Sequence, residues 1–323
     1  MIPIRDAIRS KNFPAVNVLI IGLNILAFLW ELAQGPNLKE VFYLYGIVPF
    51  RYSNPELSAH STGFQQYLPF LSSMFLHGGF LHIIMNIWFL YIFGDNIEDR
   101  LGHIRYLIFY LFCGIGAGLI HLFTNWNSNI PTIGASGAIS GVMGAYLLLY
   151  PRSRILTLIP IFFFFQLIEI PAFIFLGFWL FIQLFSAGLT PRNVGGIAFW
   201  AHIGGFVVGL IFIKIFDAIP RTGLSRTLRQ HTERQTTPRI QTISPHTSPE
   251  ELDNYGAITL TRREAAYGAR KLITIPQELK KKSLFVTIPP GVHEGTRLRL
   301  KGLGQRNQEG NREDLFLEIR ILD

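Results

Sequence analysis

Long apolar segments constrain this chain more than any other feature. Five of them are close to the 17–25 residues that a helix needs to cross a bilayer core, namely Ala15–Leu32, Tyr106–Phe123, Gly134–Tyr150, Ile170–Ala187 and Ile197–Phe216. A sixth, Phe80–Gly94, becomes long enough if it begins near Phe75. Only 15% of the residues are charged, against roughly 25% in soluble domains. We therefore expect an integral multi-pass membrane protein, built as an all-α bundle of six transmembrane helices.

Basic residues lie at alternate ends of these segments. Arg5, Arg9 and Lys11 precede the first segment, pairs of arginines follow the second and the fourth, and a basic stretch follows the sixth. Because basic residues are enriched on the cytoplasmic side of membrane proteins, we expect both termini in the cytoplasm, in the inner membrane of a bacterial cell. This placement accounts for the net charge of +8, so no nucleic-acid partner is expected.

The composition divides the chain into three parts, with boundaries at 1–216, 217–250 and 251–323. The first holds the apolar segments, joined on the outer side by a long loop over 37–73, a length that is usually functional or disordered. Pro160 and Pro171 lie on either side of the apolar run at 161–165. The stretch between these prolines is too short to cross a bilayer, so the run is predicted to lie at the cytoplasmic interface or to lead into the fifth span. The second part is rich in Arg, Thr, Ser, Gln and Pro, which predicts a flexible linker.

The third part alternates apolar and polar residues between glycines and prolines. This period of two predicts β-strands, over 258–261, 271–275, 283–288, 297–300 and 315–321. We expect a small all-β cytoplasmic domain, near the lower size limit for independent folding.

Ser136 and His202 are polar residues that lie within two of the segments expected to span the membrane. Ser136 lies in the first turn of the fourth segment, where unpaired backbone N–H groups and the helix dipole would stabilise an oxyanion. His202 lies at a similar depth near the start of the sixth segment. A neutral imidazole there could take the serine proton and return it to a leaving amine. No carboxylate candidate lies at that depth, so the sequence predicts a Ser136–His202 dyad that hydrolyses peptides inside the bilayer.

Small residues offer a way for the two helices to meet. Glycines recur at spacings of three or four in both segments and would let the backbones approach closely; they are Gly137, Gly141 and Gly144, with Gly205 and Gly209. The alternative is that these are packing motifs only, with a serine bonded to its own helix and a histidine bonded to a carbonyl. An ionisable residue inside a bilayer is costly and generally functional, which favours the dyad.

His82 and Asn86 share one face of the second segment. Both can donate hydrogen bonds, and we expect them to form the side-chain half of an oxyanion hole that complements the Ser136 amide. Metal binding by His77, His82 and His202 is the competing interpretation. It is disfavoured because no carboxylate or cysteine lies at matching depth, so neither a metal nor another cofactor is expected.

Four sequence blocks, in this order and spacing, resemble the signature blocks of rhomboid intramembrane serine proteases. They are residues 75–86, 93–102, 134–137 and 201–205, and the resemblance covers nearly all of residues 10–216. It implies Ser136 as nucleophile, His202 as general base, and His82 and Asn86 as oxyanion-binding residues. It also implies cleavage of transmembrane protein substrates near their outer ends without metal or cofactor, with a partly submerged outer loop, and with the fifth span and the loop after it gating entry.

Two departures from this family leave specificity and rate open. Many members carry an aromatic residue one turn after the serine to stack against the base, where this chain has Ser140; another group must therefore orient His202. The Trp-Arg pair often found in the outer loop is not evident between Asn37 and Ser73.

The carboxy-terminal part is similar to another family. Residues 288–304 and 313–319 resemble the substrate-binding β domain at the carboxy terminus of DnaJ-type co-chaperones, and the resemblance covers Ala257–Asp323. It implies binding of unfolded or apolar peptide segments, as by addition of a strand to an exposed edge. The tail has no His-Pro-Asp tripeptide and no cysteine pair, so stimulation of an ATP-driven chaperone is not expected. The alternative to a protease is a catalytically inactive rhomboid-like scaffold or chaperone that binds client peptides through this domain.

Overall fold

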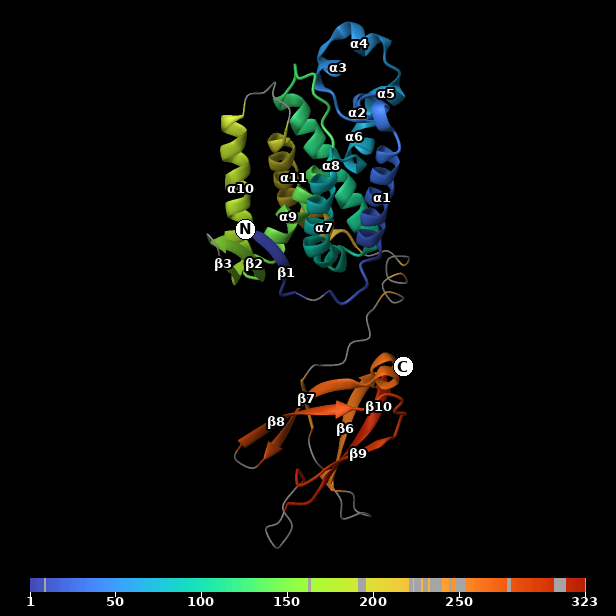
Figure 1. The fold of residues 1–323 in the computed structure, drawn as a ribbon, viewed down its shortest axis with the longest axis vertical. Helices are drawn as coiled ribbons and strands as arrows, with labels where there is room; N and C mark the ends of the chain where they lie inside the picture. Colours follow the sequence, from blue (N-terminus) through green and yellow to red (C-terminus); the bar gives the residue numbers. More distant parts are fainter. Residues whose placement is uncertain are drawn as a thin grey trace. The chain divides into compact units, whose positions relative to one another are not determined.

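The computed structural model describes residues 1–8, 10–161, 164–190, 196–220, 223, 228, 232, 240–243, 246–247, 254–277, 280–304 and 312–322. These residues form two compact units, Met1–Glu233 and Arg234–Asp323. The first is mostly helical and the second consists mostly of strands (Figure 1). The prediction of a helical membrane bundle followed by a small β domain is therefore confirmed, although the first unit also holds a small sheet and the second a short helix.

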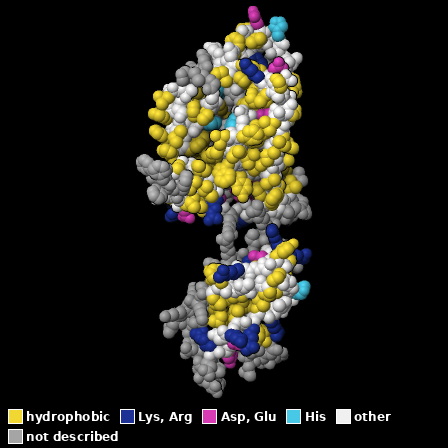
Figure 2. All heavy atoms as spheres, in the orientation of Figure 1, with side chains coloured by type: hydrophobic (Ala, Val, Ile, Leu, Met, Phe, Trp, Pro, Cys, Tyr) yellow, Lys and Arg dark blue, Asp and Glu magenta, His cyan; other side chains and the backbone are white. Residues whose placement is uncertain are grey.

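Apolar helices form the body of the first unit. Those long and apolar enough to cross a membrane are α1 (Ala15–Leu32), α7 (Phe80–Leu101), α8 (His103–Thr124), α10 (Ala172–Leu189) and α11 (Phe199–Ala218). Hydrophobic side chains cover the middle of this unit, whereas charged side chains gather toward its ends (Figure 2). Five of the six predicted spans thus have the length and composition of membrane helices.

The remaining predicted span, α9 (Ser136–Leu149), is apolar but has only 14 residues. Its residues from Gly137 to Tyr146 are all buried. Figure 1 shows α10 and α1 at opposite edges of the unit, with α7, α8, α9 and α11 between them. A helix enclosed by protein does not have to match the thickness of the lipid core, which accounts for the short length of α9.

Short helices fill the predicted outer loop. They are η1 (Gly35–Asn37), α2 (Leu38–Tyr45), α3 (Pro49–Ser53), α4 (Pro55–His60), α5 (Gly63–Tyr67), α6 (Pro69–Ser72) and η2 (Ser73–Phe75). Proline at the first position begins three of them, because its fixed φ suits a helix start and its missing N–H is not needed there. The backbone N–H of His77 then donates to both carboxylate oxygens of Glu31 on α1, at 3.0 and 3.2 Å. This contact anchors the chain just before α7.

A three-stranded antiparallel sheet lies between α9 and α10, where the sequence predicts an interfacial segment or a lead-in to the fifth span. β2 (Arg154–Ile161) and β3 (Phe164–Pro171) form a hairpin, and β1 (Ile2–Asp6) pairs with β2. The Ile, Leu and Phe residues of this stretch favour strands, and pairing satisfies backbone groups that would otherwise need water. The helix of the fifth predicted span, α10, begins at Ala172, directly after the last residue of β3, Pro171.

The amino-terminal strand is fixed to the helices by polar contacts. The indole N–H of Trp88 on α7 donates to the carbonyl of Pro3 at 2.6 Å. Asp6 accepts hydrogen bonds from the Tyr146 hydroxyl at 2.8 Å and from the Asn96 amide at 2.7 Å. Burial raises the pKa of Asp6 above its ordinary value, against the opposing effect of these hydrogen bonds.

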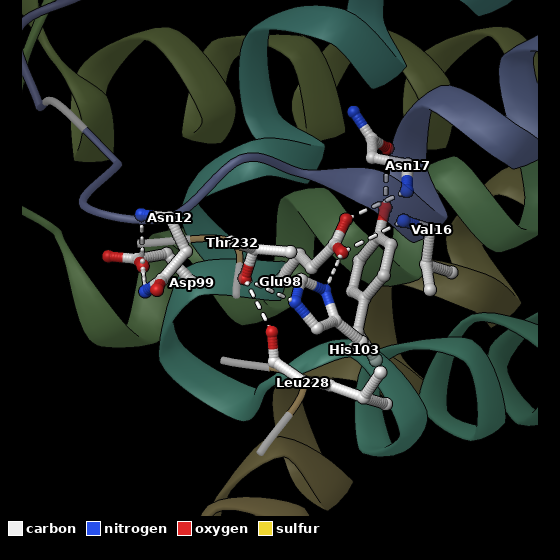
Figure 3. Close-up of polar contacts among 9 residues, drawn as sticks. Asn12, Val16, Asn17, Glu98, Asp99, His103, Leu228 and Thr232 are labelled. Atoms are coloured by element: carbon white, nitrogen blue, oxygen red, sulfur yellow. Dashed lines mark hydrogen bonds and ion pairs between the residues drawn. The ribbon is translucent and has the colours of Figure 1, made fainter. Parts of the chain in front are cut away.

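A buried carboxylate joins three parts of the helical unit (Figure 3). Glu98, near the end of α7, accepts from the backbone N–H groups of Val16 and Asn17 at 2.9 and 2.7 Å. It also contacts Nδ1 of His103, whose Nε2 lies 2.8 Å from the hydroxyl of Thr232. Since the first N–H groups of a helix have no intrahelical partner, Glu98 caps α1 and ties it to the α7–α8 corner.

The second unit contains two sheets around an aliphatic core. One has the order β5-β6-β10-β9 and the other β4-β7-β8. The strands are β4 (Ile240–Thr242), β5 (His246–Thr247), β6 (Asn254–Thr261), β7 (Ala269–Gln277), β8 (Lys280–Ile288), β9 (Arg297–Leu300) and β10 (Leu315–Leu322). Ile258, Ile273 and Ile319 are fully buried in this core. All five predicted strands are present.

A short helix, α13 (Arg262–Tyr267), was not predicted. Thr261 and Glu264 form a reciprocal capping box at its start, a spacing that the sequence displays. The predicted linker over 217–250 lies largely outside the described residues. Its described part includes β4, which pairs with β7, and β5, which pairs with β6. The division of the chain into three parts stays a prediction.

Candidate functional site

Ser136 and His202 lie within hydrogen-bond distance of each other. Ser136 is the first residue of α9 and His202 lies in the first turn of α11. The serine Oγ is 2.8 Å from Nε2 of the imidazole, a normal distance for such a bond. The structure therefore brings together the two residues that the sequence predicts as nucleophile and base.

Direct backbone contact between α9 and α11 makes this approach possible. A Cβ atom added at Gly205 would lie 1.9 Å from the carbonyl oxygen of Gly137, and one added at Gly209 would lie 1.9 Å from that of Gly141. No side chain larger than hydrogen fits at either position. The predicted close approach of glycine faces is confirmed.

The other nitrogen of His202 contacts α10. Nδ1 lies 2.8 Å from Oε1 of Gln183, and the ring of Trp179, one turn earlier on α10, lies 6.0 Å from the imidazole at an interplanar angle of 33°. Ser140, which replaces the aromatic residue expected on α9, donates instead to the carbonyl of Ser136 at 2.7 Å. The two groups in a position to orient the base, Gln183 and Trp179, thus come from α10 rather than from α9.

His82 lies beside the turn that carries Ser136. Its Nδ1 accepts a hydrogen bond from the Gly78 N–H at 3.2 Å, which leaves the proton of the neutral ring on Nε2. Gly134 has a φ of +127°, and a Cβ there would lie 2.8 Å from Nε2 of His82. The backbone conformation and the neighbouring ring both require glycine at 134, and Nε2 of His82 lies beside this glycine, two residues before the nucleophile.

Asn86, one turn further along α7, is also buried beside the site. Its side-chain Nδ2 has no hydrogen-bond partner among the described residues. A buried amide N–H without a partner is costly, and such groups often mark places where a ligand binds. Asn86 therefore offers a free donor in the wall of the cavity that Ser136 also lines.

These residues line one cavity of about 870 Å³. Ser136, His202, His82 and Asn86 all contribute to its wall, together with Gln183 and Trp179. Its size is within the range of ligand-binding cavities. All four predicted site residues are therefore brought to a single site.

Both units match families of known proteins. Residues 65–217 match the rhomboid domain family. The helical unit therefore matches this family over most of its length. Residues 256–323 match the DnaJ C terminal domain family, so the second unit corresponds to the other predicted resemblance.

The chain is similar to several rhomboid proteins of eukaryotes. It is 26% identical over 198 residues to Rhomboid protein 1, mitochondrial, of Saccharomyces cerevisiae, which covers 60% of this chain and 51% of that protein. Identity is 33% over 153 residues with RHOMBOID-like protein 6, mitochondrial, of Arabidopsis thaliana (47% and 45%), and 26% over 178 residues with Rhomboid-like protein 11, chloroplastic, of the same plant (52% and 59%). The chain spans about half the length of these relatives. Their names refer to organelles and give no support to the bacterial inner membrane expected from the sequence.

The helical unit carries two further histidines near the site. His77 precedes α7, and burial, followed by the charge of neighbouring His82, lowers its pKa to about 4; it is therefore neutral at physiological pH. His121 on α8 lines the cavity and has Nε2 2.7 Å from the Thr132 hydroxyl. Over the described residues, no three His, Cys, Asp or Glu side chains lie together as a metal site would require.

Sequence reasoning missed Gln183, Trp179 and His121 as parts of the site. His121 and Gln183 are polar groups inside apolar segments, a signal of functional interest in a membrane protein. Trp179 carried no such signal, because tryptophan is common in apolar segments and its contact with His202 depends on how α10 packs.

Proposed function

We propose that this protein is an intramembrane serine endopeptidase that cleaves transmembrane protein substrates near the outer membrane surface. The hydrogen bond of 2.8 Å between Ser136 and His202 carries the proposal. Two further observations support it, namely the cavity that both residues line and the match of residues 65–217 to the rhomboid family.

Ser136 acts as the nucleophile and His202 as the general base. As Oγ attacks the carbonyl carbon of the scissile peptide bond, Nε2 of His202 takes the hydroxyl proton and then gives it to the leaving amine. The resulting acyl-enzyme is hydrolysed by water, with His202 again accepting and returning a proton. The reaction requires no cofactor.

His82 and Asn86 stabilise the oxyanion of the tetrahedral intermediates. Nε2–H of His82 and the unpartnered Nδ2 of Asn86 donate to it, together with the backbone N–H of Ser136 at the start of α9. Donors already in place when charge develops are often the largest contribution to such catalysis.

The second unit binds unfolded or apolar peptide segments, on the basis of its match to the DnaJ C terminal domain family. We propose that both termini face the cytoplasm, as the distribution of basic residues favours. The second unit would then meet the cytoplasmic segments of membrane substrates, whereas the cavity meets their spans.

Activity-based labelling tests the proposal. The full chain in proteoliposomes is treated with a fluorophosphonate and, separately, with a single-span substrate. Labelling and cleavage are expected in the wild type, and neither in Ser136→Ala or His202→Ala. Ser140→Ala is the matched control, because Ser140 lies one turn away and its hydroxyl donates to the backbone carbonyl of Ser136 rather than to His202.

Undiminished cleavage by Ser136→Ala would contradict the assignment of the nucleophile. Absence of both labelling and cleavage in the folded wild type would favour the alternative, a catalytically inactive rhomboid-like scaffold or chaperone that holds client peptides through its carboxy-terminal domain.

A further inference from the structure

Gln183 is unusual within α10. The helix is attached to the bundle by Ala172, Phe175 and Leu176 near its start, and beyond Leu176 the only buried residue in this completely described helix is Gln183. Its side chain is 7% exposed, whereas Leu184 next to it is 49% exposed. Burying an amide is costly unless its polar atoms are paired. The position therefore calls for an explanation through what the amide binds.

The amide binds the nitrogen of His202 that does not face Ser136. Oε1 of Gln183 lies 2.8 Å from Nδ1, and Nε2 lies 2.8 Å from the serine Oγ. A carbonyl oxygen only accepts hydrogen bonds, so Nδ1 must carry the proton of the neutral ring. Nε2 then presents its lone pair to the serine hydroxyl, which is the tautomer that a general base requires.

We infer that Gln183 is a positioning residue that fixes the tautomer and orientation of His202 through its amide oxygen. The inference rests on the proposed proteolytic function. When His202 accepts the serine proton, the Nδ1–H···Oε1 bond gains a charged donor and becomes stronger. Gln183 thereby stabilises the imidazolium without placing a carboxylate in the membrane, which a third catalytic residue of the usual kind would do.

This role gives α10 control over the base. Ser136 and His202 lie on α9 and α11, whose backbones touch, but the group that orients the imidazole lies on a third helix. Trp179, one turn before Gln183 on α10, places its indole ring 6.0 Å from the imidazole of His202. A shift of the outer half of α10 would release Nδ1 and leave the imidazole free to rotate, with the Ser136 backbone unmoved.

Three variants in full-length protein test the inference. Gln183→Leu keeps the approximate volume but removes the acceptor, and we expect kcat and the rate of fluorophosphonate labelling to fall roughly 10–100-fold, with KM and the unfolding temperature little changed. Gln183→Glu restores an acceptor and should retain more activity than Gln183→Leu. Its pH–rate profile should have the acidic limb displaced to higher pH, because a carboxylate favours the imidazolium. Leu184→Ala, on the lipid-exposed side, is the control and should match the wild type.

The outcomes separate this inference from the proposed function. Wild-type kcat and labelling in folded Gln183→Leu would overturn the positioning role while leaving the protease intact, as would a loss confined to KM. If Gln183→Leu does not fold, Gln183→Glu decides, since a pH–rate profile identical to that of the wild type would overturn the inference. Failure of the wild type itself to cleave or label would overturn both.

Discussion

Replacement of Gly205 by alanine tests whether backbone contact assembles the site. The added Cβ would lie 1.9 Å from the carbonyl oxygen of Gly137, while ordinary van der Waals contact begins at 3.4 Å. The helices α9 and α11 would therefore have to separate locally by roughly 1.5 Å to relieve the overlap. Gly205 lies one turn after His202, so most of this displacement would reach the hydrogen bond of 2.8 Å between His202 and Ser136.

A hydrogen bond stretched by that amount is effectively lost. We expect Gly205→Ala to reduce cleavage and labelling by about 100-fold or more, the cost typical of a misplacement of about 1 Å in an active site. Overpacking should also lower the free energy of unfolding by about 1–3 kcal/mol.

The assay is cleavage of a single-span substrate in proteoliposomes, with fluorophosphonate labelling and thermal unfolding of the same samples. Gly177→Ala on α10 is the matched control, because a Cβ there meets nothing within 4 Å. It makes the same chemical change in a membrane helix without a clash. Equal activity of Gly205→Ala and Gly177→Ala would refute the idea that the glycine contact holds the dyad together.

Three further changes have defined outcomes. Asn86→Ala should lower kcat by about 100–1000-fold with little change in unfolding temperature, since its Nδ2 has no partner among the described residues; unchanged kcat would count against its role. Burial raises the pKa of Asp6, so the folded state keeps this proton to higher pH than the unfolded state, and stability should fall as the pH rises from about 4 through the raised pKa. Asp6→Asn should flatten this part of a plot of unfolding temperature against pH, and an unaltered slope would exclude Asp6 as the cause. Thr261→Ala removes a capping-box hydrogen bond and should destabilise a fragment of residues 234–323 by about 1 kcal/mol in urea unfolding; an unchanged midpoint would show that the cap is dispensable.

Local patterns explain most of what the sequence predicted correctly. Helices of bilayer length follow from continuous apolar runs, and the five carboxy-terminal strands follow from a period of two. The site residues could be placed together because their depth is set by their position within each span. Ser136 and His202 both lie near the start of segments that begin on the same side, and His82 and Asn86 lie one helical turn apart.

The features that the sequence did not predict depend on partners distant in the chain. The apolar stretch 154–171 is compatible with an interfacial segment or a hairpin, and its central strand is paired by β1, which lies some 150 residues earlier. Gln183 belongs to no motif with a fixed spacing, and its role emerges only when α10 is placed against His202. In contrast, the capping box at Thr261 was visible in the sequence and could have revealed α13.

Two different kinds of contact thus define the candidate site. The distance between nucleophile and base is set by α9 and α11, where glycines bring backbone against backbone and leave little freedom to move. The orientation of the base is set by α10, whose outer half has one buried residue, Gln183, with Trp179 and Leu180 only partly buried against the core. A helix bound so weakly along its outer half can shift at low cost, whereas one packed glycine to glycine cannot. The spacing of the Ser136–His202 pair is consequently a fixed property of the fold, and the readiness of His202 to accept a proton varies with the position of α10.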